Sequence, residues 1–266
     1  MSDLFKLFTG FVPPRLCEAL VEQTFAFKRR HYSEENLGAH RAYLADKQPH
    51  RTSHAYAVGQ SYVEGFTGPL PTITLEAEAE IPHLYTVSKD VLAKVLDLNR
   101  ESRVLFNVQE YYGGSERVPK HMDGELLEFH ADAEGNLDII RSIRPEKVAV
   151  LTLVNDTDGG GTRVHLPGGK EEVIRAQAGD LLVFNNVECF HSVDALTGTV
   201  RREDGLLRMT IGWRSLADRV HYYEKDPGTC FRVTMDEANK LIESWYKNEW
   251  PRQWENIQQS RQKAAF

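Results

Sequence analysis

Two histidines and one aspartate stand at positions from which a single metal ion could be bound. His121 and Asp123 are two residues apart in VPKHMDGELLEF, and side chains at i and i+2 of a strand point to the same face. His191 follows the apolar run DLLVFNN, which indicates a separate strand. Two imidazoles and one carboxylate form the facial set that suits non-haem Fe(II), because three protein ligands leave neighbouring positions open. We therefore predict that His121, Asp123 and His191 are the metal ligands and the catalytic residues.

A second His-x-Asp pair, His130 and Asp132, competes for the same role. It stands in FHADAEGN, whose Asp, Gly and Asn residues are typical of a turn, and it lacks the Tyr-Gly-Gly that precedes the first pair. We favour the first pair and keep the second as the alternative. His165, in TRVHLPGG, could line a pocket, but we expect it to bond to its surroundings. Three further histidines are expected at the surface: His31, His40 and His83.

The run LLRMTIGWR predicts a strand with one apolar and one polar face. Alternation places four apolar side chains together, as in a core beneath helices: Leu207, Met209, Ile211 and Trp213. Arg208 and Thr210 share the other face, and a guanidinium beside a hydroxyl suits a carboxylate ligand. Exposure of that face to water is the alternative. Arg201 and Arg202 compete with Arg208, but their segment TGTVRREDG is typical of a hairpin loop.

Together these motifs resemble the Fe(II)/2-oxoglutarate-dependent dioxygenase superfamily over residues 103–215. The pattern of that family is H-x-D, a distant His, and an Arg followed two residues later by Ser or Thr. The matching residues are His121-Met122-Asp123, His191 and Arg208-Met209-Thr210. In many members the Arg lies closer to the distal His than it does here. The GGGT turn and the GDLLVFNN run that precedes the distal His support the resemblance.

The resemblance implies an Fe(II) centre that uses 2-oxoglutarate as cosubstrate and O2, with Arg208 and Thr210 holding the far carboxylate of 2-oxoglutarate. Gln109 and Tyr111, in VLFNVQEYY, resemble strand positions from which family members contact this cosubstrate, and Tyr112 is the alternative to Tyr111. The implied function is hydroxylation of a small molecule, such as an amino acid or a natural-product intermediate, with release of succinate and CO2.

Other functions could use the same residues. Asp123 argues against halogenation, because halogenating members of the family replace this carboxylate with a small residue. A divalent-metal hydrolase on a cupin-like barrel could bind its ion through two His and one Asp, but it leaves the Arg-x-Thr strand unexplained. A non-catalytic small-molecule binding jelly roll is the other alternative, and the intact ligand set argues against it. Substrate contacts are expected from residues 33–82 and 124–147, which include Arg141 and Arg144.

The elements around these motifs predict a mainly β fold with flanking helices. Short β-rich runs separated by Gly-rich turns fill residues 103–215, which is typical of a double-stranded β-helix (jelly roll) core. Residues 14–29 have helical spacing, Ser88 could cap a second helix, and Thr234 and Glu237 stand at a capping-box spacing. We expect the N-terminal and C-terminal helices to pack on the larger sheet.

We expect residues 1–266 to form a single domain in three parts. Residues 1–102 would be a helical and loop addition, in which residues 33–82 form loops with one or two short strands. Residues 103–215 would form the jelly-roll core, and residues 216–266 a C-terminal helical segment.

Composition and charge limit the partners. With 32 Lys and Arg against 39 Asp and Glu, the formal charge is -7, so we expect no nucleic acid as partner. No apolar run approaches the about 18 residues that span a membrane, so we expect no membrane partner either. Cys17, Cys189 and Cys230 are odd in number and widely spaced, which favours reduced thiols in a cytoplasmic protein. The expected partner is a small-molecule substrate, and the sequence leaves the oligomeric state open.

Overall fold

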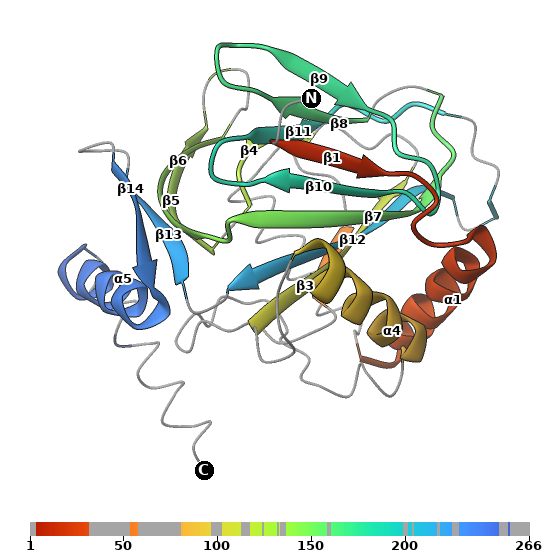
Figure 1. Ribbon diagram of the computed structural model, residues 1–266, viewed down its shortest axis with the longest axis horizontal. Helices are drawn as coiled ribbons and strands as arrows, with labels where there is room; N and C mark the ends of the chain where they lie inside the picture. Colours follow the sequence, from red (N-terminus) through yellow and green to blue (C-terminus); the bar gives the residue numbers. More distant parts are fainter. Residues whose placement is uncertain are drawn as a thin grey trace.

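The computed structural model describes residues 4–31, 54–57, 81–96, 103–112, 118–123, 125–131, 133, 137–158, 161–198, 202–203, 205–216, 219–224, 229–249 and 255. The strands within these ranges form three antiparallel sheets, and helices flank them (Figure 1). The mainly β architecture with flanking helices that the sequence predicts is therefore confirmed.

Two of the sheets face each other as the layers of the jelly roll. The six-stranded sheet has the order β1 (Phe5–Phe8), β10 (Leu181–Asn185), β7 (Lys147–Asn155), β12 (Leu206–Leu216), β3 (Arg103–Tyr112) and β2 (His54–Ala57). The smaller sheet has the order β4 (Val118–His121), β11 (Phe190–Val193), β8 (Thr162–His165) and β9 (Glu171–Ile174). In Figure 1 strands β8 and β9 of the smaller sheet lie above β1 and β10.

An apolar core joins the two layers. It contains side chains from both sheets and from the turn before β11: Val148, Val164, Ile174, Leu182, Phe184 and Cys189. Strands of the larger sheet bury a second set of side chains on their other face, where helices cover them. β7 shows why, because Val148 belongs to the core between the sheets while Ala149 and Leu151 belong to the core beneath the helices. A strand covered on both faces is apolar on both, which explains the run VAVLTLV.

Strand β12 has the two faces that its sequence predicts. Met209, Ile211 and Trp213 are buried in the core beneath the helices, while Arg208 and Thr210 point to the space between the sheets. The prediction differs at one position. The pairing of β12 with β3 shifts register between Leu206 and Arg208, and Leu206, in place of the expected Leu207, belongs to the helix-side core.

Helices α1 (Pro14–His31) and α4 (Pro82–Asp90), the latter continued by a short π-helical turn at Val91–Val95, cover the larger sheet. The helical segment at residues 14–29 is confirmed. Ser88 does not cap a helix as expected: Pro82, whose φ is already helical, begins α4, and Ser88 lies within it. The Ser88 hydroxyl instead accepts a hydrogen bond of 2.9 Å from Trp213 Nε1, which ties α4 to β12. None of the described helices is long and apolar enough to cross a membrane.

The expected position of the C-terminal helix was wrong. A third sheet has the order β14 (Thr229–Thr234), β13 (Arg219–Glu224), β6 (Leu137–Arg144) and β5 (Glu125–Ala131). Its strands β13 and β14 occupy the start of residues 216–266, the segment expected to be helical. Helix α5 (Met235–Glu249) packs against β13 and β14, on the far side of the molecule from α1 and α4 (Figure 1). The reason is local, because the helix follows β14 directly and folds back over its own hairpin. Its capping box is confirmed, since Thr234 N donates to Glu237 Oε2 at 2.8 Å and Glu237 N donates to Thr234 Oγ1 at 3.2 Å.

The N-terminal segment supplies a strand that the sequence did not predict. β1 pairs with β10 at the edge of the larger sheet, and the chain then crosses Gly179 in the turn before β10. Val12 N donates to Gly179 O at 3.0 Å. Gly179 has a φ of +92°, and a Cβ at this position would collide with the carbonyl oxygen of Val12, so only glycine fits the turn.

Candidate metal centre

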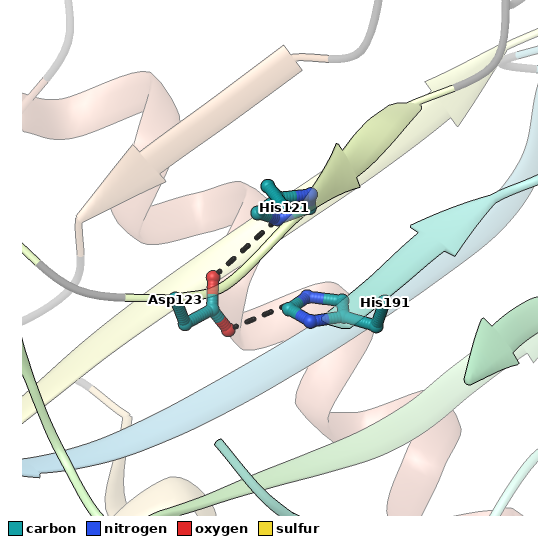
Figure 2. Close-up of side chains that lie close together, drawn as sticks. All are labelled: His121, Asp123 and His191. Atoms are coloured by element: carbon teal, nitrogen blue, oxygen red, sulfur yellow. Dashed lines mark ion pairs between the residues drawn. The ribbon is translucent and has the colours of Figure 1, made fainter. Parts of the chain in front are cut away.

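The two histidines of the predicted ligand set lie directly opposite each other on neighbouring strands. His191 on β11 pairs with His121 at the end of β4, and their ring centroids are 4.2 Å apart. Asp123 lies just beyond β4 and turns its carboxylate towards both rings (Figure 2). Its Oδ1 is 3.6 Å from His121 Nε2, and its Oδ2 is 3.7 Å from His191 Nε2. Residues that are far apart in the sequence thus meet through strand pairing.

The donor atoms of this cluster fit one metal ion. One ligand atom from each residue lies within 4.8 Å of the others. Ligand bonds of about 2.0–2.2 Å allow two atoms bound to one ion to lie at most about 4.4 Å apart, so both measured ion-pair distances are compatible with a shared ion. The side chains of Asp123 and His191 are each 9% exposed, and the Phe184 ring lies against His191 with centroids 4.7 Å apart. This packing restricts the orientation of the His191 ring.

A pocket between the two sheets opens onto the cluster. Its free space, counted with the solvent in its open mouth, is about 470 Å³. All seven residues singled out by the sequence line it: His121, Asp123, His191, Arg208, Thr210, Gln109 and Tyr111. The structure therefore brings the predicted metal ligands and the predicted carboxylate-binding residues into one cavity.

Arg208 is the unusual charge of this pocket. The residue is only 4% exposed, and its Nη2 donates to Thr162 Oγ1 at 3.0 Å. Its Nε and Nη1 are buried and have no hydrogen-bond partner among the residues that the structure describes, although a buried guanidinium ordinarily has its donors satisfied. Burial lowers the pKa of Arg208 from its ordinary value. Unused N–H groups on a buried cation could donate to an anionic ligand.

Gln109 and Tyr111 stand beside Arg208 because of strand register. β3 pairs with β12 so that Tyr111 is opposite Arg208 and Gln109 is opposite Thr210. The Tyr111 hydroxyl donates to Gln109 Oε1 at 2.7 Å, and the Arg208 guanidinium carbon is 5.5 Å from the centroid of the Tyr111 ring. Tyr111 is 1% exposed, and nothing is described for the side chain of Tyr112, the alternative. The four side chains form one polar wall on two paired strands.

Thr162 is the polar pocket residue that sequence reasoning missed. Its hydroxyl holds the Arg208 guanidinium, and it begins β8, where residues alternate between buried and half-buried. The GGGT turn was noticed in the sequence, and alternation in TRVH would have placed Thr162 on the inner face with Val164. Gly161 is required before it, because a Cβ there would lie 2.6 Å from Ile174 O on β9. Apolar pocket residues were also missed: Val118, Val150, Phe184 and Val193.

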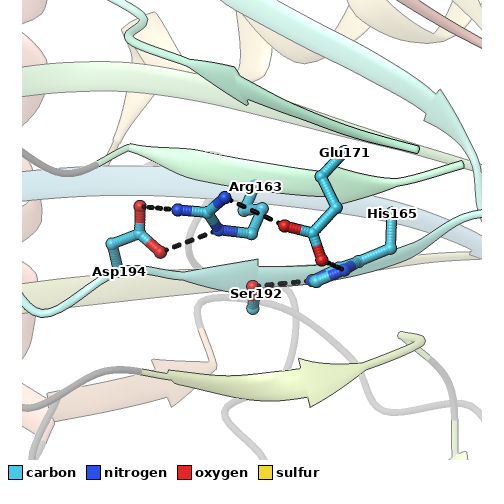
Figure 3. Close-up of polar contacts among 5 residues, drawn as sticks. All are labelled: Arg163, His165, Glu171, Ser192 and Asp194. Carbon is cyan, nitrogen blue, oxygen red and sulfur yellow. Dashed lines mark hydrogen bonds and ion pairs between the residues drawn. The ribbon is translucent and has the colours of Figure 1, made fainter. Parts of the chain in front are cut away.

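His165 lies on the outer face of the smaller sheet and is bonded to its surroundings, as expected. Its Nδ1 is 2.8 Å from Glu171 Oε1 and its Nε2 is 2.9 Å from Ser192 Oγ (Figure 3). Arg163 continues this network, bonding both oxygens of Asp194 at 3.0 and 2.9 Å and Glu171 at 3.0 Å. Because Ser192 follows His191 on β11, the network fastens the strand that carries a predicted metal ligand.

The His165 network predicts a loss of stability in acid. Burial lowers the pKa of His165 from its ordinary value; Lys120 and Arg163 add to this effect and Glu171 opposes it. The unfolded chain therefore binds a proton at higher pH than the folded protein, so stability falls as pH drops below the ordinary value of 6.5. His165→Gln should reduce this loss in urea unfolding between about pH 7.5 and about pH 5.5. An unchanged pH dependence in the variant would contradict the assignment.

The competing candidates lie elsewhere or outside the described residues. His130 is on β5 of the third sheet, opposite Asp138, and Asp132 lies outside the described residues. Arg202 lies in the turn before β12, where Gly205 N donates to its carbonyl, and Arg201 is outside the described residues. Among the histidines expected at the surface, His83 is exposed, whereas the side chain of His31 and all of His40 are outside the described part.

Arg144, expected near the substrate, is buried behind the pocket. It is fully buried, its guanidinium stacks at 3.8 Å from the centroid of the Tyr223 ring, and its Nη1 contacts Met122 Sδ. Met122 stands between two of the predicted ligands, so Arg144 supports the end of β4 from the third sheet. The side chain of Arg141 is outside the described residues.

The cysteines agree with the expected reduced state where they are described. Cys17 and Cys189 are buried and free. Burial raises the pKa of Cys17 to about 11, with Glu18 and Asp180 adding to the effect, and burial also raises the pKa of Cys189. A thiol that stays protonated is unreactive, which fits packed side chains. Nothing is described for the side chain of Cys230.

No protein-family model and no curated protein matches the sequence. Solved structures with similar chain traces include a prolyl-4-hydroxylase from Pseudomonas putida, with 18% identity, a TM-score of 0.43, and coverage of 79% of this chain and 91% of that one. A viral collagen prolyl hydroxylase from Paramecium Bursaria Chlorella virus-1, as a 2-oxoglutarate complex, has 12% identity, a TM-score of 0.43, and coverage of 80% and 96%. HygX from Streptomyces hygroscopicus, with nickel and 2-oxoglutarate bound, has 11% identity, a TM-score of 0.44, and coverage of 79% and 82%. Likeness at this level assigns neither a substrate nor an activity to this chain.

Proposed function

We propose that this chain is an Fe(II)- and 2-oxoglutarate-dependent oxygenase that hydroxylates a small molecule and releases succinate and CO2. The observation that carries the proposal is the buried Arg208 guanidinium, whose Nε and Nη1 have no hydrogen-bond partner within the described part of the chain. It lines the same pocket as the His121, Asp123 and His191 cluster. A dicarboxylate bound at the metal would place its far carboxylate against this guanidinium, as the resemblance in sequence implies.

The residues of the pocket have three separate roles in this proposal. His121, Asp123 and His191 would hold Fe(II), which, with 2-oxoglutarate and O2, supplies the oxidising chemistry: one oxygen atom goes to succinate and the other to the substrate. Arg208 and Thr210 would bind the far carboxylate, and charge-assisted bonds from a planar guanidinium would fix its direction. Gln109 and Tyr111 would complete the polar wall beside it.

The apolar pocket residues would keep water from the reacting atoms. Val150, Phe184 and Val193 line the same cavity as the metal ligands and the polar wall. An apolar lining strengthens the electrostatic attraction between Arg208 and a carboxylate, because the local dielectric constant is low. It also leaves few competing hydrogen-bond donors, so the ligand is held in one orientation.

Anaerobic spectroscopy tests the proposal. We expect addition of Fe(II) and then 2-oxoglutarate to the purified protein without oxygen to give a weak visible metal-to-ligand charge-transfer band. The band requires the keto oxygen and the adjacent carboxylate of 2-oxoglutarate to bind iron. Asp194→Ala is the control and should keep the band, because Asp194 bonds Arg163 on the outer face of the smaller sheet. Failure to bind iron and to give the band would refute the oxygenase and leave a hydrolase or a binding protein.

The proposed substrate is a small molecule. The formal charge of -7 disfavours a polyanion such as nucleic acid. A screen for succinate release over amino acids and small metabolites would identify the class, and mass analysis of the product would give the position of the added oxygen. Turnover of a peptide, with none on small molecules, would contradict this part alone.

A further inference from the structure

Asn186 lies next to Asp123, one of the three predicted metal ligands. It follows β10 directly, is fully buried, and belongs to the GDLLVFNN run that precedes His191. Its side chain does not line the pocket, because it is occupied by backbone groups of two other segments. The backbone N–H of Asn186 donates to Glu146 O at 2.9 Å, which fixes the backbone from which the side chain extends.

The side-chain amide of Asn186 forms hydrogen bonds with both the backbone N–H and the backbone C=O of Asp123. Asp123 N donates to Asn186 Oδ1 at 2.9 Å, and Asn186 Nδ2 donates to Asp123 O at 2.6 Å. A second bond from Nδ2 reaches Pro145 O at 3.1 Å. These partners assign the amide orientation, since the N–H must face the oxygen and the two carbonyls must face the nitrogen. The side chain thus acts as a peptide group of a neighbouring strand would.

Asp123 needs such a partner because the β-ladder ends before it. β4 ends at His121, and its pairing with β11 extends no further along the chain than the pair of His121 and His191. Both backbone groups of Asp123 lie in a buried region, where a backbone group without a hydrogen-bond partner destabilises the fold. The Asn186 side chain replaces the missing strand and fixes the peptide units on both sides of the Asp123 side chain.

We propose that Asn186 is a positioning residue of the metal centre, holding the Asp123 carboxylate towards His121 and His191 by clamping the Asp123 backbone. This inference rests on the metal-binding part of the proposed function. The preceding residue has a different role, because Asn185 Oδ1 accepts from Val187 N at 2.9 Å and Glu188 N at 3.0 Å, which builds the turn leading to His191. The two consecutive asparagines therefore serve one metal ligand each.

Asn186→Ser tests the clamp with Co(II) as the probe, in aerobic solution and without cosubstrate. A serine hydroxyl is too short to bridge the Asp123 N–H and carbonyl. We expect Co(II) affinity to fall by about 10- to 100-fold, the effect of losing an outer-shell partner, and the visible ligand-field spectrum to change. Asn155→Ser is the matched control, because Asn155 also bridges backbone groups, Ala176 O at 2.7 Å and Thr157 N at 3.3 Å, away from the metal ligands.

The outcomes separate the clamp from general stability. Unchanged Co(II) affinity and spectrum in Asn186→Ser, or an equal loss in Asn155→Ser, would overturn the proposal. If Asn186→Ser does not fold, amide hydrogen exchange in the metal-free wild-type protein decides: the Asp123 N–H should be as protected as the amides of β11, and rapid exchange would overturn the clamp. If the wild type binds no Co(II), the metal centre fails, while the exchange result still reports on the clamp.

Discussion

Asp123→Ala is expected to abolish tight iron binding and, with it, turnover. The variant removes the carboxylate whose two oxygens lie 3.6 and 3.7 Å from the two imidazoles. Affinity for Fe(II) should fall by more than about 100-fold, the upper end of the effect of losing an outer-shell partner, because a direct ligand is lost. Calorimetric titration under anaerobic conditions measures this. The rise in melting temperature that bound metal gives the wild type should disappear as well.

Asp194→Ala is the control for this variant. Asp194 is also a partly buried carboxylate close to β11, but it bonds Arg163 on the outer face. Loss of a largely solvent-screened ion pair costs about 0–1 kcal/mol, so this variant should bind iron as the wild type does. Iron binding by Asp123→Ala at wild-type affinity would remove Asp123 from the ligand set and return His130 and Asp132 as candidates.

Arg208→Met is expected to have opposite effects on cosubstrate binding and on stability. Loss of the guanidinium removes the partner of a buried carboxylate, which costs about 2 kcal/mol or more and raises the Kd for 2-oxoglutarate at least about 30-fold. In the ligand-free protein the same substitution replaces a buried cation with two nitrogen atoms, Nε and Nη1, that have no hydrogen-bond partner in the described ranges. Methionine fills similar space without that desolvation cost, so the free energy of unfolding should equal or exceed that of the wild type.

Two measurements check this pair of effects. Calorimetry on the Mn(II)-loaded protein gives the Kd for 2-oxoglutarate, and urea unfolding of the ligand-free protein gives stability. Arg202→Met is the matched control, because Arg202 lies in the turn before β12 and not in the pocket, and it should leave the Kd unchanged. A larger loss of 2-oxoglutarate affinity in Arg202→Met would contradict the choice of Arg208 as the carboxylate-binding residue. Marked destabilisation of ligand-free Arg208→Met would show that Arg208 has a structural role instead.

The sequence determined those features that depend on local geometry. Alternation alone separated Arg208 and Thr210 from Met209, Ile211 and Trp213, because side chains of a strand point to opposite faces whatever the strand pairs with. The capping box at Thr234 was equally predictable, since its hydrogen bonds span three residues. The residue types of the metal cluster also indicated its chemistry before any distance was known.

Only the tertiary structure decided which residues meet. The pairing of His121 with His191 depends on the register of β4 and β11, and a shift of one residue would turn one imidazole away from the other. Thr162 and Asn186 escaped prediction because their partners, Arg208 and Asp123, are distant in sequence. The same cause misplaced α5, whose partner strands were not foreseen.

The sequence by itself therefore determined the residue types of the candidate metal-ligand set and the faces of its strands, whereas register and burial decided how the set comes together. His121, Asp123 and His191 define a ligand set by type and spacing, but a ligand set binds metal only when its atoms converge. The three side chains converge because His121 pairs with His191 across two strands and because the Asn186 side-chain amide bonds the backbone of Asp123, just beyond the end of β4. Both are long-range contacts, whose energies depend on the whole fold and are not encoded in any short run of residues.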